Sequence, residues 1–228
     1  MALSACDDRP RRPVPEDAGV DASSEASSAP SSSAPSSVSA VTNVDWLTFR
    51  NADAGLRLQY PPEVTLLTRP ADEPEGLGLF ITIDPIAGAE NSADLEADRT
   101  ALAAGEYGIH EDAPVEGSEQ VAPVDGGRAK VFTVMSRTEI CDVSFDRGAV
   151  LYAGDYRVRL LLRASEKKML EAAPKSFRAD PGNCGQKLVW KAGRPKRFYA
   201  ELARGKGPAF AVDWFRTFDE ILATVTVR

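Results

Sequence analysis

Few side chains in this 228-residue chain have the chemistry that catalysis usually requires. His110 is the only histidine, so any Ser-His-Asp or Cys-His site would have to use it. It lies in the polar stretch Gly108-Ile109-His110-Glu111-Asp112, which is typical of a surface loop. A single histidine also rules out a histidine-rich metal site, and we expect no bound metal or cofactor. The sequence contains no GxGxxG, P-loop or GxSxG motif, so the common nucleotide-binding and nucleophile signatures are absent.

A pair of carboxylates, as in glycoside hydrolases, is the remaining catalytic option. The chain has 34 Asp and Glu residues, and no motif selects two of them. The sequence therefore leaves the question of catalysis open, although we expect a protein that is not an enzyme.

The first residues of the chain place a cysteine in a distinctive context. Leu3-Ser4-Ala5-Cys6 resembles the lipobox of bacterial lipoproteins, in which a Leu and two small residues precede a Cys. The resemblance implies that Cys6 carries a lipid and anchors the chain in the bacterial cell envelope, outside the cytoplasm, in either the inner or the outer membrane. The alternative is a chance match in a cytosolic protein. A secretory signal needs about 7–15 apolar residues before the cleavage site. We therefore expect either that translation starts upstream of Met1 or that the chain has been shortened there.

Residues 7–42 consist mainly of Ser, Ala, Pro and acidic residues, with scattered valines as their only large aliphatic side chains. Such a segment buries too little apolar surface to offset the entropy lost on ordering, so we expect a disordered tether. The chain then divides into a signal remnant at residues 1–6, the tether at 7–42, and one globular domain at 43–228.

Cys141 and Cys184 are the only cysteines besides Cys6. If the domain is exported, an even pair in an oxidising compartment predicts a disulfide. In the chain-entropy model, a loop of this length would stabilise the fold by about 4 kcal/mol. The alternative is a pair of buried thiols.

Charge is distributed unevenly along the chain, whose net charge is −7. Residues 1–127 carry 7 basic and 23 acidic residues, whereas residues 128–228 carry 20 basic and 11 acidic residues. Seven basic residues lie close together in sequence, with Trp190, Phe198 and Tyr199 among them: Lys187, Lys191, Arg194, Lys196, Arg197, Arg204 and Lys206. They predict a basic face that binds an anionic envelope polymer or an acidic protein. The alternative is that the two halves interdigitate and neutralise each other locally. Nucleic acid is not an expected partner outside the cytoplasm.

Alternation of apolar and polar residues dominates the pattern of the domain. Residues 56–60 alternate in this way and predict a half-buried strand, which a hairpin connects to residues 46–49. Further strands are predicted at residues 77–83, 129–137 and 140–146. The clearest hairpin joins residues 149–153 to residues 156–163, because Gly154-Asp155 suits a two-residue turn with positive φ.

Helices are predicted at residues 92–104 and 165–173, and a third begins at Pro195 and ends just before Gly205. The C-terminus carries the strongest helical signal, a single apolar face made by Trp214, Phe218, Ile221, Leu222 and Val225. Thr217 and Glu220 form a capping-box pattern, which predicts that the regular helix begins there. The order of these elements predicts an α+β domain with helices packed on an antiparallel sheet.

Two segments of the domain resemble PsbP-like domains, which occur in many bacterial lipoproteins. Gly55–Pro62 (GLRLQYPP) is similar to their opening G-φ-x-φ-x-Y-P hairpin, and Phe218–Thr224 (FDEILAT) is similar to their closing F-x-x-I-L-x-T/S helix. The resemblance implies an antiparallel sheet flanked by helices. It also implies binding or accessory roles more often than catalysis, with no shared catalytic residues.

The leading hypothesis is a non-catalytic envelope lipoprotein that binds a protein or a polymer. One alternative is an extracytoplasmic hydrolase that uses a carboxylate pair. Another is an immunity- or inhibitor-type lipoprotein.

Overall fold

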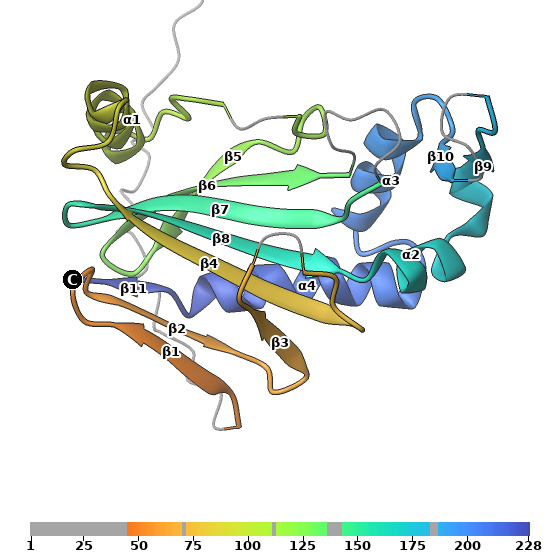
Figure 1. The fold of residues 1–228 in the computed structure, drawn as a ribbon, viewed down its shortest axis with the longest axis horizontal. Coiled ribbons are helices and arrows are strands. Elements are labelled where there is room, and N and C mark those ends of the chain that lie inside the picture. Colours follow the sequence, from red (N-terminus) through yellow and green to blue (C-terminus); the bar gives the residue numbers. More distant parts are fainter. Residues whose placement is uncertain (1–44, 70–71, 111–112, 136–142, 183–186) are drawn as a thin grey trace, which may run out of the picture. The chain divides into compact units, whose positions relative to one another are not determined.

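The central element of the fold is a six-stranded sheet in the order β3-β4-β8-β7-β6-β5 (Figure 1). The computed structural model describes residues 45–69, 72–110, 113–135, 143–182 and 187–228. The strands are β3 (Val64–Leu67), β4 (Leu77–Pro85), β5 (Gln120–Val124), β6 (Gly127–Val134), β7 (Asp146–Ala153) and β8 (Tyr156–Ala164). Neighbouring strands are antiparallel, apart from β3 and β4, which run parallel. The predicted α+β class, an antiparallel sheet flanked by helices, is therefore confirmed.

The predicted hairpin forms the centre of this sheet. Ala153 of β7 pairs with Tyr156 of β8, and Gly154 begins the turn between them with a φ of +57°. A residue with a Cβ would be strained there, so the glycine allows the two strands to meet in a tight turn. Leu160–Leu162 is buried, as expected for a strand covered on both faces.

The strand register assigns alternate residues to two faces. Val131, Ala149 and Leu160 align across β6, β7 and β8 and belong to the main core, where helix α4 (Ala209–Ala223) packs against the sheet. Trp214 of α4 is fully buried, and its indole N–H donates a hydrogen bond to the carbonyl of Leu162 at 2.9 Å. The opposite face holds a smaller cluster, formed by Phe132, Val134, Val150 and Leu161.

Smaller elements surround the central sheet. The helices are α1 (Ser92–Ala104), α2 (Glu166–Ala172) and α3 (Arg194–Leu202), with a 3₁₀ turn, η1 (Pro174–Ser176). A three-stranded sheet contains β1 (Leu47–Asn51), β2 (Leu56–Tyr60) and β11 (Thr226–Val227), and a two-stranded sheet contains β9 (Phe177–Ala179) and β10 (Leu188–Trp190). α1 lies at one end of the central sheet, and α2 and α3 lie at the other (Figure 1).

The two segments that resemble PsbP-like domains meet in space. β2 lies between β1 and β11 in the three-stranded sheet, so the opening hairpin pairs with the end of the chain. The backbone N–H of Gln59 donates to the Thr224 hydroxyl at 2.8 Å, and that hydroxyl donates back to the carbonyls of Gln59 and Ile221. Thr224 therefore joins the end of α4 to the hairpin.

Two element boundaries differ from the sequence-based expectation. Helix α4 begins at Ala209, so the prediction that it starts at Thr217 is wrong. Ala211 and Phe215 are buried on the same face as Phe218, and this burial extends the helix through the capping-box residues. The strand predicted at residues 140–146 is also misplaced in its described part, because residues 143–145 precede β7, which begins at Asp146.

Several predictions concern residues outside the described part of the chain. Cys6, the tether at residues 7–42, and Cys141 and Cys184 all lie there, so the lipid anchor, the tether and the disulfide stay predictions. Among the described residues, no helix combines the length and the apolar composition needed to cross a bilayer.

Candidate functional site

A buried salt bridge joins α1 to the central sheet. The side chains of Lys130 on β6 and Asp98 on α1 are 1% and 2% exposed, and Lys130 Nζ lies 2.6 Å from Asp98 Oδ2. The same ammonium group donates to the carbonyl of Ile109 at 2.8 Å. The Tyr152 hydroxyl donates to Asp98 Oδ2 at 2.6 Å, and the Ile109 N–H donates to Asp98 Oδ1 at 2.7 Å. Both carboxylate oxygens are therefore satisfied inside the protein.

The protonation states in this network favour a structural role. Burial by itself raises the pKa of Asp98, but the hydrogen bonds from Lys130, Tyr152 and Ile109 outweigh it and hold the pKa below its ordinary value. Burial and the neighbouring Asp98 carboxylate both raise the pKa of Tyr152. A carboxylate held ionised is a poor general acid, and a phenol held neutral is a poor general base. The network fixes α1 and Ile109 on the sheet.

A second buried cation attaches α4 to the other side of the sheet. The side chain of Arg147 on β7 is 2% exposed, and its Nη2 lies 2.6 Å from Asp219 Oδ1. Its Nη1 donates to the Thr133 hydroxyl at 3.0 Å, and its guanidinium carbon lies 3.7 Å from the centre of the Phe215 ring. Through these contacts the arginine holds α4 against the sheet.

His110 lies on the surface, as the sequence predicted for its loop. Its side chain is 69% exposed, its Nδ1 lies 2.8 Å from Glu119 Oε1, and its ring stacks on Tyr107. No Ser or Cys with a hydrogen bond to this ring is found in the described residues, so the geometry of a nucleophile–histidine pair is not present there. The described residues also contain no group of three or more His, Cys, Asp and Glu that could hold a metal ion.

The structure separates the predicted basic residues into two groups. Arg194 faces inward: its two terminal nitrogens bind the Glu201 carboxylate at 3.2 and 3.1 Å, and its Nε donates to the Ser176 hydroxyl. Lys191 donates to the carbonyl of Lys175, and Lys187, just before β10, is exposed. We interpret Arg194 and Lys191 as residues that join α3 and β10 to the turn at η1.

The aromatic residues within the basic segment also have structural positions. Phe198 is fully buried, Tyr199 packs near Phe215, and Trp190 packs against Phe145 and Phe177. None of these rings is freely exposed. They anchor the basic segment to the main core. A partner would therefore contact mainly the charged side chains of this segment.

The remaining basic side chains lie on the outer side of α3 and its following turn. We call Lys196, Arg197, Arg204 and Lys206 the α3 surface; all four are exposed. Lys196 and Arg197 lie on α3, and Arg204 and Lys206 lie in the segment that follows its end at Leu202. Lys196 pairs with Glu116, with side chains 59% and 78% exposed. Arg197, Arg204 and Lys206 form no ion pair with any described residue.

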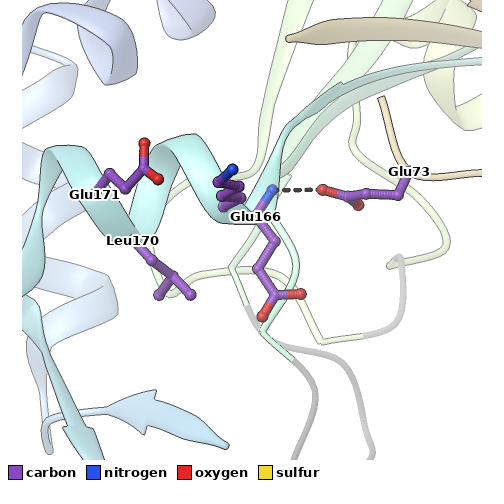
Figure 2. A pocket seen from close by; sticks show the side chains of 5 residues that line it. Glu73, Glu166, Leu170 and Glu171 are labelled. Carbon is purple, nitrogen blue, oxygen red and sulfur yellow. Dashed lines mark hydrogen bonds between the residues drawn. The ribbon is translucent and has the colours of Figure 1, made fainter. Parts of the chain in front are cut away.

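A pocket of about 520 Å³ beside α2 is lined by three glutamates, Lys167 and Leu170. The hydrolase alternative requires a cleft that holds two facing carboxylates. Figure 2 shows the carboxylates of Glu73, Glu166 and Glu171 pointing in different directions, without a common focus. Glu73 accepts the backbone N–H of Glu166 at 2.6 Å, so it caps the start of α2. All three glutamates are exposed, whereas a glycosidase acid needs a carboxyl group withdrawn from water.

Comparisons with known proteins give limited information. No family model matches the chain, and no curated protein sequence matches it. Among solved structures, the chain is similar to the Ran-binding protein Mog1p of Saccharomyces cerevisiae, with 8% identity and a TM-score of 0.36 over 81% of this chain and 96% of that one. It is also similar to cyanobacterial PsbP (CyanoP) from Synechocystis sp. PCC 6803, with 11% identity and a TM-score of 0.32 over 69% of this chain and 99% of that one. At these TM-scores, the two similarities establish neither the family nor the function of the chain.

Sequence reasoning missed the buried network of Asp98, Lys130 and Tyr152. One signal was present, because Lys130 interrupts the apolar run from Ala129 to Val134 at a position where alternation places it on the second face of the sheet. The partner could not be read from sequence, since Asp98 is 32 residues away on a different element.

Proposed function

We propose that this chain is a non-catalytic, lipid-anchored envelope lipoprotein whose domain binds an acidic protein or an anionic polymer through the α3 surface. The observation that carries the proposal is the set of three cations on that surface, Arg197, Arg204 and Lys206, which have no acidic partner among the described residues. An anionic partner would supply the charge that the fold leaves unmatched.

The surroundings of these cations support recognition by charge. Arg194, in the same segment, is neutralised by Glu201, and Lys196 is weakly matched by Glu116. Arg197 is exposed on α3 and Arg204 and Lys206 are exposed just after it, while Phe198 and Leu202 hold the buried face of the helix in the core. Lys196 and Arg197 are therefore carried by a helix whose backbone is already ordered, which reduces the backbone entropy lost when a partner binds.

The contacts and exposure of the candidate catalytic groups support a binding role over catalysis. Asp98, Lys130, Tyr152, Arg147 and Asp219 are engaged in contacts that hold helices to the sheet. The histidine is exposed, and the glutamates beside α2 do not converge (Figure 2). A domain with these properties is better suited to adhesion than to acid–base chemistry.

The location rests on the lipobox resemblance at Leu3-Ser4-Ala5-Cys6 and on the composition of residues 7–42. Lipidated Cys6 would hold the chain on a membrane of the envelope, and the tether would allow the domain to reach partners away from the lipid surface. Mass spectrometry of the chain produced from its own gene, including the upstream codons, tests this part. A diacylglycerol adduct on Cys6 is expected, and an unmodified, soluble product would refute it.

Charge reversal tests the binding surface. We expect a variant with Arg197→Glu, Arg204→Glu and Lys206→Glu to lose binding to poly-L-glutamate or to polygalacturonate, measured by calorimetry at two salt concentrations. The two probes represent an acidic protein segment and an anionic polysaccharide. Binding of the unmodified chain should weaken as salt rises, because exposed charges are screened beyond about 8 Å at physiological ionic strength.

The matched control reverses three exposed cations elsewhere, Arg50, Arg57 and Lys167, which changes the net charge by the same amount. This control variant should keep most of the binding. Equal losses in the two variants would mean that only net charge matters, and no loss in the first would refute the α3 surface as a binding site. A photo-crosslinker at position 206, compared with one at position 57, would then identify the partner in intact envelopes.

A further inference from the structure

A second cavity is lined in part by α1. This helix lies at the opposite end of the central sheet from α2 and α3 (Figure 1). Its volume is about 420 Å³, within the range of small-molecule sites. It is open to solvent and is bordered by α1, by the β5–β6 turn and by the β7–β8 hairpin. The lining residues are Arg99, Leu102, Ala103, Gly126, Gly127, Arg128, Tyr152 and Gly154.

The charges that line this cavity are all positive. Arg99 and Arg128 contribute guanidinium groups, and no Asp or Glu belongs to the lining. Arg99 is held in position by Glu96 at 2.6 Å, by Asp155 at 3.6 Å and by the Gly154 carbonyl at 3.1 Å. Its geometry is therefore set before any ligand arrives.

Arg128 differs from Arg99 because it has no ion pair or hydrogen-bonded partner among the described residues. Its guanidinium lies over Gly105, where an added Cβ would come within 2.3 Å of Nη1. Gly105 has a φ of +91° and ends α1, so the glycine both closes the helix and leaves room for the arginine.

Arg128 is not needed to complete the end of α1. In the last turn of the helix, the carbonyls of Ala101 and Leu102 already accept the N–H groups of Glu106 and Gly105. The favourable field at a helix C-terminus accounts for one nearby cation. Arg99 is matched by Glu96 and Asp155, so Arg128 is the guanidinium of this cavity that has no acidic partner among the described residues.

The other walls are apolar or consist of backbone. Leu102 is buried and Tyr152 is half-buried, and the hydroxyl of Tyr152 is fixed by its hydrogen bond to Asp98. Gly126, Gly127 and Gly154 contribute backbone and no side chain to the lining. The buried Lys130–Asp98 pair, which holds Tyr152 through Asp98, therefore also fixes one wall of the cavity.

We propose that this cavity binds a small organic anion, whose carboxylate or phosphate group is held by Arg128 and Arg99 and whose apolar part lies against Leu102 and Tyr152. A guanidinium fork matches two oxygens of either group. The site is separate from the α3 surface, which lies at the opposite end of the sheet (Figure 1). It does not depend on the proposed function.

Calorimetry with phenyl phosphate and benzoate tests the proposal, with inorganic phosphate and neutral benzyl alcohol as comparison probes. Arg128→Gln should weaken binding of the two aromatic anions by about tenfold or more, as expected for loss of a charge-assisted hydrogen bond. Ala103→Trp, at an exposed position of the lining, should block the cavity without removing a charge. The control Arg57→Gln removes an exposed cation elsewhere and should leave binding unchanged.

Each other outcome overturns the proposal. Equal binding by the Arg128→Gln and Arg57→Gln variants would show that the guanidinium plays no specific part. Inorganic phosphate binding as tightly as phenyl phosphate would show that the apolar walls play none. Failure of both aromatic anions to bind at millimolar concentration would show that the cavity is not a site for this class. Loss of binding in the α3 charge-reversal variant would show that the anions bind at that surface.

Discussion

Two lysine–carboxylate pairs in this domain have nearly the same geometry and opposite surroundings. Lys130 and Asp98 lie 2.6 Å apart, with side chains 1% and 2% exposed. Lys196 and Glu116 lie 2.5 Å apart, with side chains 59% and 78% exposed. Each pair joins the acidic first half of the chain to the basic second half. The two distances are nearly equal, so the pairs differ in how far their side chains are exposed to water.

The comparison separates charges that organise the fold from charges that remain available. A buried ion cannot regain hydration if its partner is removed, so each member of the Lys130–Asp98 pair depends on the other. Members of an exposed pair exchange their partner for water at little cost. Lys196 can therefore transfer from Glu116 to an external anion, whereas Lys130 cannot. For this reason the proposed binding surface is placed at α3 and not at the buried network.

The largest effect is expected from Lys130→Met. The substitution keeps most of the aliphatic volume but leaves the Asp98 carboxylate buried without its cation, which typically costs about 3–5 kcal/mol of unfolding free energy. Urea unfolding followed by circular dichroism measures the loss. The double variant Lys130→Met with Asp98→Asn should be more stable than Lys130→Met alone, because it removes the uncompensated charge. A double variant no better than the single one would show that packing, and not charge, explains the loss.

The pH dependence of stability is expected to distinguish Asp98 from the exposed carboxylates. The pKa of Asp98 is below its ordinary value in the folded protein, so its contribution is fully present above about pH 4, where the unfolded chain is also ionised. It is lost as pH falls through the folded pKa. Asp98→Asn removes this titration, so the difference in stability between the two proteins should shrink between pH 5 and pH 2. Glu116→Gln should follow the unmodified chain over the same range. A constant difference for Asp98→Asn would contradict the lowered pKa.

The parts of the fold that sequence reasoning found are those with local signals. α1 ends before Gly105, which caps it in the left-handed conformation, and the β7–β8 hairpin turns at Gly154, so both signals act within a few residues. At the start of α1 the structure shows no side-chain cap. The parallel pairing of β3 with β4 and the pairing of β11 with β2 have no such signal, because each depends on contacts between distant segments. The start of α4 was misjudged for the same reason: burial of Ala211 and Phe215 against the sheet overrides a local capping pattern.

The sequence predicted that basic residues cluster in this segment, but it did not predict which of their side chains are paired and which face solvent. The spacing of Arg194 and Arg197 in sequence gives no indication that one faces inward to Glu201 while the other faces solvent. Glu116 lies 80 residues from Lys196, so local neutralisation was not visible either. The cavity near α1 was missed altogether, since its lining comes from a helix, a turn and a hairpin that only the fold brings together.

The smallest effect is expected at the exposed pair, and it tests whether the α3 surface is free to bind. Lys196→Met, the counterpart of Lys130→Met, should change the unfolding free energy by no more than about 0.5 kcal/mol, because water replaces the lost contact. A double-mutant cycle with Glu116→Gln in urea unfolding measures the coupling directly. The same Glu116→Gln variant should strengthen binding to poly-L-glutamate, since it removes the internal competitor for Lys196. A coupling as large as that of Lys130 with Asp98 would mean that Lys196 is committed to the fold, and the α3 surface would then rest on Arg197, Arg204 and Lys206 alone.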